Sequence, residues 1–578
     1  MAIGILLDSH TLRAYAVNPA DKYQVELLKD IWKGPASSNP RSFNEMNGKL
    51  YFTAKTWDYG YELWVTDGTT EGTYMVKDIY FDYLDSEPYG MTVFRDKLYF
   101  IATSEDEGRE LWVSDDTSEG TELFMDFNQN GPSNLFDLNV VGDQLFFLAN
   151  DGEHGQELWV TNGTVDGTYM VKDINTLVDN YGRPGTSNIL QMAELNEKVY
   201  FSARDNTHGR ELWTSDGTLD GTYMVADINP NGDSLGNPDP NSIWFTPLNG
   251  KLIFPANDNQ YGEEWWSTDG TEIGTKRFTD VGRYWHSDFI QCVSPTCTTV
   301  MNNELYFSGA FEDSQGYYGQ ELWKTDGTAQ GTLMVKDINV GGSDSLPRDL
   351  VVLDEKLIFS ANDGSSRSLW ISNGTAEGTS ELCPLSWPSD LLMFDGNVIF
   401  HSDDNLWITD GTTEGTTEIH YGFSTICNGC GLGKVLGDKL IFMAATAELG
   451  GELYVLSPKP TSPTDNPTTN NPTTQNPTTT SPTDSTTTIN PTTENPTATS
   501  PTTTSPTTTS PETVPPNKAF SLGGNNANIP CSLEEYECGS TYTGCIMHIY
   551  RPATGDCVDI CAYFISFRLA LGWQCGPC

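Results

Sequence analysis

The chain has few basic residues, no long apolar run and few cysteines over most of its length. Its 31 Lys and Arg stand against 79 Asp and Glu, which gives a formal net charge of −48 at pH 7. A surface this acidic repels phosphate backbones, so nucleic acid is not expected as a partner. No apolar stretch is long enough to predict a membrane span. The apolar residues 1–7 end at Asp8 without a preceding basic cluster, so a strand is expected there and no secretory signal is visible.

The cysteines are concentrated at the end of the chain. Seven of the 12 lie between Cys531 and Cys578, a density typical of a disulfide-stapled module in an oxidising compartment. Zinc is the alternative, but the cysteine spacings are irregular and His548 is the only nearby histidine. Because seven is odd, one cysteine is free, pairs with another chain or pairs with an earlier cysteine. A monomer and a disulfide-linked oligomer therefore both stay open.

A change of composition separates this module from the rest of the chain. Residues 457–517 consist mainly of Pro, Thr, Ser and Asn, a mixture that cannot form a core and that predicts a disordered, mucin-like stalk. Most of the charge lies before the stalk. We therefore expect three parts: a repeat domain at 1–456, the linker at 457–517 and a cysteine-rich module at 518–578.

Internal repetition dominates the first part. A tripeptide that ends in an aromatic residue recurs nine times, at Trp64, Trp112, Trp159, Trp213, Trp266, Trp323, Trp370, Trp407 and Tyr454. Each copy follows a short apolar segment and precedes a turn such as Asp67-Gly-Thr and a further apolar segment. Short runs rich in Val, Ile, Tyr, Phe and Trp, broken by Asp-Gly or Asn-Gly, are typical of antiparallel strands.

Four such strands in each repeat predict an all-β fold, a β-propeller of about nine blades. The last repeat lacks a strand after Leu456, and residues 24–31 have the sequence of that missing strand. We therefore expect N- and C-terminal strands to share one blade and to close the ring. Nine blades is an unusual number and eight stays open. An open solenoid is the alternative, although its two ends do not meet and so would not need to have matching sequences.

The repeat resembles the family named for its ELWxxDGT motif. The resemblance rests on segments such as Glu62–Thr69, Glu157–Thr164 and Glu321–Thr328, and it covers residues 12–456. It implies a secreted or surface-exposed propeller without an agreed activity. Residues 368–370 and 405–407 depart from the motif because they lack its Glu.

The repeated acidic residues predict structure more than catalysis. An active site needs unique residues, whereas the Asp of Asp-Gly-Thr and the Glu before Leu-Trp recur in most repeats. We expect the Asp to form the turn and the Glu to accept hydrogen bonds from backbone amides. Catalysis by carboxylates between blades is the alternative.

Calcium is the one cofactor that the sequence suggests. Asp126, Asn128 and Asn130 alternate before a glycine, and Asp137 follows at the twelfth position of the same segment. Asp227, Asn229 and Asn231 repeat the opening of that pattern. Alternating oxygen ligands that end in glycine are what a calcium loop uses to surround the ion. The alternative is a turn between blades.

Covalent modification is predicted at two kinds of site. Asn162 and Asn373 each begin an Asn-Gly-Thr sequon for N-glycosylation. Cys292 with Cys297 and Cys427 with Cys430 are expected to bridge locally, which leaves Cys383 buried. The terminal cysteines are expected to form disulfides of open connectivity: Cys531, Cys538, Cys545, Cys557, Cys561, Cys575 and Cys578.

These features favour a non-catalytic extracellular or cell-surface protein that recognises a glycan or a matrix protein. The alternative is a secreted carbohydrate-active enzyme whose cysteine-rich module targets the substrate. Unique paired carboxylates in a central funnel would favour the enzyme, and shallow faces would favour binding.

Overall fold

The computed structural model describes residues 19–235, 245–279, 298–313, 316–426, 431–459, 546–550 and 557–561. The chain divides into two compact units, Met1–Thr469 and Asn470–Cys578. In the described part of the second unit, β38 (Ile546–Tyr550) pairs antiparallel with β39 (Cys557–Cys561). The described helical turns are 3-10 turns, η1 (Pro19–Lys22) and η2 (Val165–Gly167). Within these ranges no helix is long and apolar enough to cross a bilayer.

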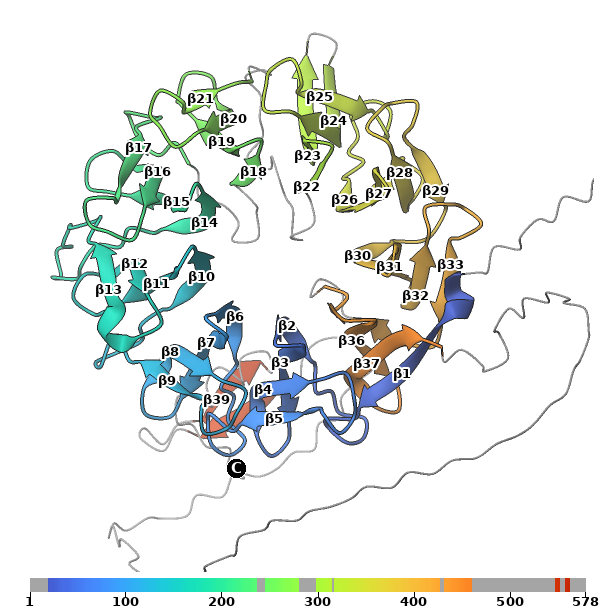
Figure 1. Ribbon diagram of the computed structural model, residues 1–578, viewed down its shortest axis with the longest axis horizontal. Helices are drawn as coiled ribbons and strands as arrows, with labels where there is room; N and C mark the ends of the chain where they lie inside the picture. Colours follow the sequence, from blue (N-terminus) through green and yellow to red (C-terminus); the bar gives the residue numbers. More distant parts are fainter. Residues whose placement is uncertain are drawn as a thin grey trace, which may run out of the picture. The chain divides into compact units, whose positions relative to one another are not determined.

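The first unit is a nine-bladed β-propeller of antiparallel sheets, seen as a ring in Figure 1. Each blade runs outward from an inner strand. Blades one to four contain β2 (Arg41–Met46), β3 (Lys49–Thr56), β4 (Gly60–Thr66) and β5 (Tyr74–Lys77); β6 (Tyr89–Phe94), β7 (Lys97–Ser104), β8 (Gly108–Ser114) and β9 (Glu122–Met125); β10 (Phe136–Val141), β11 (Gln144–Asn150), β12 (Gln156–Thr161) and β13 (Thr168–Lys172); β14 (Leu190–Leu195), β15 (Lys198–Arg204), β16 (Arg210–Ser215) and β17 (Tyr223–Ala226).

The same four-stranded order continues through blades five to eight. They contain β18 (Thr246–Leu248), β19 (Lys251–Asn257), β20 (Glu263–Thr268) and β21 (Lys276–Arg277); β22 (Thr298–Met301), β23 (Glu304–Asp313), β24 (Gly316–Thr325) and β25 (Leu333–Lys336); β26 (Arg348–Leu353), β27 (Lys356–Asn362), β28 (Arg367–Ser372) and β29 (Ser380–Cys383); β30 (Ser389–Phe394), β31 (Asn397–Ser402), β32 (Asn405–Thr409) and β33 (Thr417–His420). The predicted all-β propeller and its count of nine are confirmed.

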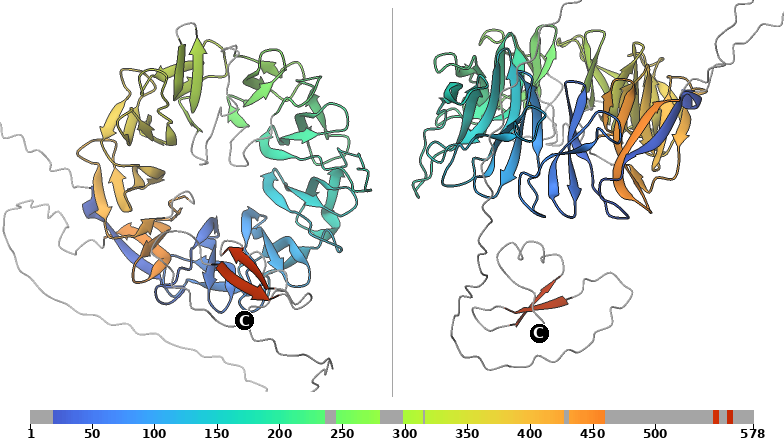
Figure 2. Two further views of the ribbon diagram at one scale, coloured as in Figure 1. Left: turned by 180° about the vertical axis from the view of Figure 1, so that it is seen from behind. Right: turned by 60° about the horizontal axis from the view of Figure 1, so that its bottom comes forward.

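The ninth blade is built from both ends of the propeller sequence. Its strands are β1 (Tyr23–Lys29), β34 (Thr425–Ile426), β35 (Lys434–Leu436), β36 (Lys439–Thr446) and β37 (Gly450–Pro458). β1 pairs antiparallel with β37, so that Tyr23 lies opposite Pro458 and Leu27 opposite Tyr454. The predicted closure by terminal strands is therefore confirmed, and it excludes the open solenoid. Figure 2 shows β1 beside β37 from two further directions.

The core lies between blades, because the two faces of each third strand pack against different neighbours. Leu63 and Val65 of β4 pack with Leu98 and Phe100 of the second blade. Trp64, between them in sequence, packs on the opposite side with residues of the ninth blade, including Leu453. Alternation of side chains along the strand produces this division. Each blade therefore buries apolar side chains against both of its neighbours. Loss of any blade would expose the apolar side chains of two others.

The Asp-Gly-Thr turns bring neighbouring blades into close contact. Gly270 and Gly374 have φ angles of +92° and +84°, which favour glycine. A Cβ at Gly270 would lie 2.2 Å from the Tyr200 hydroxyl oxygen, and one at Gly374 would lie 2.3 Å from the Tyr306 hydroxyl oxygen. Both tyrosines belong to the preceding blade. These glycines are therefore required both by the turn and by the neighbouring blade.

The antiparallel order gives the propeller two different faces. One, here called the loop face, carries the hairpins between second and third strands and the connections between blades. The opposite face carries the Asp-Gly-Thr turns and the hairpins between first and second strands. Loops on a rigid scaffold are the usual place for binding residues, so the loop face is where a binding site is expected.

Candidate functional site

The glutamate before Leu-Trp is a buried acceptor that holds the next connection between blades. Glu62 is 0% exposed. Its Oε2 accepts hydrogen bonds from the Ile79 backbone amide at 2.9 Å and from the Ser86 hydroxyl at 2.7 Å. Its Oε1 accepts from the Ser86 backbone amide at 3.3 Å. The expected structural role of this residue is therefore what the structure shows. The same arrangement of buried carboxylate and serine recurs at Glu110, Glu157, Glu211, Glu321 and Glu452.

Burial is the main cause of the raised pKa values of these glutamates. It raises the pKa of Glu62 from an ordinary 4.5 to about 8, although the hydrogen bonds from Ile79 and Ser86 oppose the change. Burial likewise raises the pKa of Glu110, Glu157, Glu211 and Glu321 to about 7. Neighbouring Asp78 adds a smaller repulsive contribution at Glu62. Ionisation of these glutamates therefore changes the free energy of unfolding of the propeller.

Blade seven has Ser368 in place of the glutamate, and the preceding residue, Arg367, contacts the connection that enters this blade. Arg367 is 8% exposed. Its Nη2 donates to the Leu346 carbonyl oxygen at 3.0 Å, and its Nη1 donates to the Ser360 hydroxyl at 3.0 Å. The connection between blades six and seven is thus held by a donor to its backbone carbonyl. Arg210 of blade four makes the same kind of bond, to the Asn188 carbonyl oxygen at 2.5 Å, beside an intact Glu211, so Arg367 does not take over the role of the missing glutamate.

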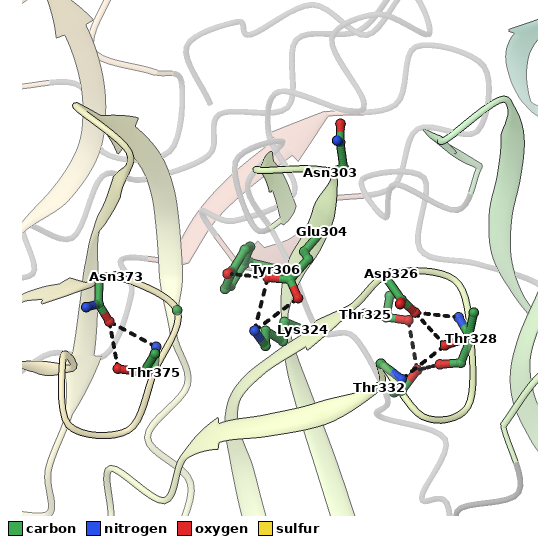
Figure 3. Close-up of polar contacts among 12 residues, drawn as sticks. Asn303, Glu304, Tyr306, Lys324, Thr325, Asp326, Thr328, Thr332, Asn373 and Thr375 are labelled. Atoms are coloured by element: carbon green, nitrogen blue, oxygen red, sulfur yellow. Dashed lines mark hydrogen bonds and ion pairs between the residues drawn. The ribbon is translucent and has the colours of Figure 1, made fainter.

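The aspartates of the Asp-Gly-Thr turns use their carboxylates within the turn. Asp326 Oδ1 accepts from the Thr328 amide at 2.9 Å and from the Thr328 hydroxyl at 2.6 Å (Figure 3). Thr325 and Thr332 close the turn by a hydroxyl contact of 2.8 Å. Gly331 lies five residues after Asp326 and is here called the second glycine of the turn motif. A Cβ at Gly331 would lie 2.0 Å from Asp326 Oδ1, so this glycine makes room for the carboxylate. These carboxylates are positioned to shape a turn.

A serine, an aspartate and a histidine meet on the inner strands of blade eight. His401 Nε2 lies 2.7 Å from Asp390 Oδ2 and 3.0 Å from Ser389 Oγ. A catalytic triad needs the serine and the carboxylate on opposite ring nitrogens, so that the histidine can accept a proton from the serine while the carboxylate orients it. Here both contacts share one nitrogen. The group has the composition of a triad without its geometry.

The first predicted calcium loop makes hydrogen bonds within itself. It connects β9 to β10, where Asp126 Oδ1 accepts from the Asn128 amide at 3.0 Å and Asn128 Oδ1 accepts from the Asn130 amide at 3.2 Å. Asp137 lies on β10 at a positive φ of 56°, and its Oδ1 accepts from Asn139 Nδ2 at 2.7 Å. Burial raises the pKa of Asp137. Asp137 is thus held by Asn139 of its own strand and by the Met192 backbone on β14 of the next blade.

The second predicted loop follows β17 and shares part of this internal bonding, although its Asn229 amide donates to Glu211 Oε1 at 3.4 Å and not to Asp227. Asn229 Oδ1 accepts from the Asn231 amide at 3.2 Å, and Asn229 Nδ2 donates to the Asp233 carbonyl oxygen at 3.0 Å. Asp227 precedes this turn. Over the residues that the structure describes, no three Asp, Glu, His or Cys side chains converge as metal ligands. This absence concerns Asp, Glu, His and Cys side chains and not the asparagine oxygens of the two loops. Calcium binding therefore stays a prediction for both loops.

Both predicted glycosylation asparagines are exposed in turns of the Asp-Gly-Thr type. Asn162 Oδ1 accepts from the Thr164 amide at 3.1 Å and from its hydroxyl at 2.7 Å. Asn373 makes the same two bonds with Thr375, at 3.1 and 2.8 Å (Figure 3). The asparagine therefore replaces the usual aspartate without changing the turn. Glycosylation itself stays a prediction.

The cysteine predictions fall largely outside the described residues. Cys383 is a half-buried free thiol at the end of β29, and burial raises its pKa. It is less buried than the sequence suggested. Cys557 and Cys561 are the first and last residues of β39. The other cysteines expected to pair lie outside the described ranges: Cys292, Cys297, Cys427, Cys430, Cys531, Cys538, Cys545, Cys575 and Cys578.

Sequence reasoning missed a group of aromatic residues on the loop face, formed by Trp32, Trp57, Tyr59, Phe81 and Tyr83 and here called the aromatic loop surface. All but the half-buried Trp32 are exposed. Three segments supply them: the connection from β1 to β2, the hairpin between β3 and β4, and the connection from β5 to β6. The signal was present in the sequence, because Trp57-Asp58-Tyr59 and Phe81-Asp82-Tyr83 share the pattern aromatic–Asp–Tyr.

Contacts between these segments define the surface. The ring centroids of Trp32 and Trp57 lie 6.3 Å apart with an interplanar angle of 54°. A Cβ at Gly60 would lie 2.0 Å from the Leu84 carbonyl oxygen, so the hairpin touches the connection from β5 to β6. Asp85 Oδ1 accepts from the Tyr61 amide at 2.9 Å. The three segments are thus packed against one another.

Comparison with known proteins finds only a weak likeness to solved structures. No protein-family model and no curated protein matches the chain. A puromycin hydrolase structure is 11% identical over 64% of this chain and 58% of that one, with a TM-score of 0.30. The β-propeller domain of the Trilobed protease from Pyrococcus furiosus is 10% identical over 67% and 99%, with a TM-score of 0.31. A prolyl endopeptidase structure is 8% identical over 68% and 55%, with a TM-score of 0.34. Scores this low carry no argument about activity.

Proposed function

We propose that the chain is a non-catalytic extracellular or cell-surface protein that binds a glycan or a matrix protein. The observation that carries this proposal is the aromatic loop surface, where four exposed rings from two segments lie beside the half-buried Trp32 of a third segment, on one face of a closed ring of blades. Large exposed apolar groups cost free energy in water, and a cluster of them is typical of an interaction site. The repeated carboxylates support binding over catalysis, since those of Glu62 and Asp326 hold the fold itself.

The rest of the sequence supports an extracellular location. The Pro/Thr-rich segment 457–517 and the cysteine-dense segment 518–578 have compositions typical of a glycosylated stalk and a secreted disulfide module. We infer that the propeller is displayed on this stalk. We also infer that the chain belongs with the ELWxxDGT-repeat proteins, on the motifs quoted above.

The experiment is a binding screen with the full chain. Purified protein is applied to an array of glycans and to a panel of extracellular matrix proteins, with bound protein measured against concentration. We expect saturable binding to a glycan or a matrix protein. Turnover of a polysaccharide by the chain, or saturable binding to neither class, would contradict the proposal.

A further inference from the structure

We propose that the aromatic loop surface binds neutral saccharide chains by stacking sugar rings on its aromatic side chains. The inference rests on the proposed binding function and names both the site and the class of ligand. It is carried by the exposure of the rings, by their anchoring and by the carboxylates placed among them.

The exposure of these rings is large and local. Trp57 is 74% exposed, Tyr83 73% and Phe81 64%. Elsewhere in the described part of the loop face, exposed aromatic side chains such as Tyr181, Trp387 and Tyr421 come from different connections between blades. Here two tripeptides and Trp32 contribute together. A flat ligand surface binds more tightly to several ring faces than to one, because each ring adds apolar contact area to the complex.

The rings are carried by loops that are tied down. Gly60 has a φ of +67° and abuts the Leu84 carbonyl, so the hairpin has no room to shift toward its neighbour. Lys55 Nζ forms an ion pair with Asp85 Oδ1 at 3.0 Å, and Asp85 also accepts from the Tyr61 amide. The Ser86 amide donates to the Tyr61 carbonyl oxygen at 3.0 Å. A preformed surface loses little conformational entropy when it binds.

Carboxylates between the rings favour a saccharide over a protein partner. Asp58 lies between Trp57 and Tyr59 in sequence, Asp82 lies between Phe81 and Tyr83, and both aspartates are exposed. The central part of a protein interface is depleted of charged residues. A sugar instead presents C–H groups on its ring faces and hydroxyl donors at its edges. An aromatic–Asp–Tyr tripeptide offers a face for the first and an acceptor for the second.

Charge restricts the saccharide to a neutral one. The chain carries a net charge of −48, and two of its exposed carboxylates, Asp58 and Asp82, lie on this surface. Sulfated or uronic-acid glycans would meet like charge here, which costs affinity and slows association. A neutral chain of hexose or N-acetylhexosamine units meets no such penalty.

The test uses the full chain on an array of neutral oligosaccharides, followed by titration of the best-bound member. Trp57→Ala and Tyr83→Ala each remove one exposed ring. Trp387→Ala and Tyr181→Ala are the matched controls, since they remove an exposed Trp and an exposed Tyr from other connections. We expect each surface variant to weaken the Kd at least about tenfold, which corresponds to about 1.4 kcal/mol, and each control to leave it unchanged. Thermal melting should be the same for all four, because the removed rings are exposed.

Other outcomes separate this inference from the proposed function. Neutral glycan binding that is equal in Trp57→Ala and Trp387→Ala would overturn the site while leaving the binding function standing. Binding to heparin or to a matrix protein in place of neutral glycans would overturn the ligand class. A change of oligomeric state in Trp57→Ala by light scattering, without glycan binding, would show that a second copy covers the surface. If Trp57→Ala fails to fold, Tyr83→Ala against Tyr181→Ala supplies the same comparison.

Discussion

The Ser38 hydroxyl donates a hydrogen bond of 2.7 Å to Glu452 Oε2, although the two residues are 414 positions apart in the chain. Glu452 Oε2 also accepts from the Ile31 amide at 2.7 Å, and its Oε1 accepts from the Ser38 amide at 3.1 Å. In blade one the same bonds join Glu62 to Ser86, only 24 positions away. One repeated carboxylate arrangement thus serves both as an ordinary link between blades and as the lock of the closed ring.

Replacing Glu452 by Ala should loosen the ring at its closure. The substitution removes the acceptor of the Ile31 amide, whereas the amide and hydroxyl of Ser38 keep only their bonds to the Gly451 carbonyl oxygen. A buried donor left unpaired costs about 1–3 kcal/mol. We expect a lower melting temperature and faster hydrogen exchange in β1 and β37. Glu62→Ala is the matched control, because it breaks the same bonds inside one chain segment. It should lower the melting temperature comparably while leaving exchange in β1 unchanged. Equal exchange of β1 in both variants would contradict a special role for Glu452.

The stability of the propeller should fall as the pH rises from about 5 to about 8. The pKa values of the buried glutamates are raised, to about 8 at Glu62 and about 7 at Glu110, from an ordinary 4.5. Between these values the native state holds protons that the unfolded state has released, so raising the pH favours unfolding. Thermal melts at constant ionic strength measure this slope. Glu62→Gln mimics the neutral form and should reduce the slope, whereas exposed Glu71→Gln should not. An undiminished slope in Glu62→Gln would refute the assignment.

The second glycine of the turn motif should not tolerate a side chain. In Gly72→Ala the new Cβ would lie 2.0 Å from Asp67 Oδ1. Either the carboxylate or the turn must move, and a forced rearrangement of this kind costs about 1–3 kcal/mol. Gly131→Ala is the control, because its nearest neighbour would lie 3.5 Å away. Urea unfolding of both variants measures the difference, and equal midpoints would count against the role of Gly72.

Asn162 and Asn373 should carry N-glycans when the chain is made in a secretory host. Asn162→Asp and Asn373→Asp supply the residue that most other repeats have at this position, so the turn should keep its hydrogen bonds. We expect each variant to lose one glycan by mass spectrometry of the intact protein, with an unchanged melting temperature. Identical masses before and after enzymatic deglycosylation would show that the sequons are unused.

Millimolar calcium should raise the melting temperature if the loops at Asp126 and Asp227 bind it. An ion that binds only the native state stabilises it by mass action, and magnesium should act less because it requires a tighter octahedral shell. Asp126→Ala should lose part of the response at matched ionic strength. An identical response in the variant and the original chain would assign the loop to turn formation alone.

The fold was largely predictable because its determinants are local and repeated. Glu62 and Asp326 each lie within a motif whose copies report the same role, and β1 could be matched to the last blade by sequence alone. The aromatic loop surface was not predicted, because Trp32, Trp57 and Phe81 come from three segments that only folding brings together. The positive φ of Asp137 was also invisible, since nothing local marks the register shift of its strand.

The sharing of one blade by β1 and β37 has a consequence for synthesis on the ribosome. Translation proceeds at about 5–20 residues per second, so β1 emerges on the order of half a minute or more before its partner exists. During that interval Tyr23–Lys29 is a strand without a sheet, and the edge of the first blade has no neighbour to cover Trp64. Chaperone binding to the nascent chain should therefore concentrate on these two segments and end when residues 450–458 leave the exit tunnel.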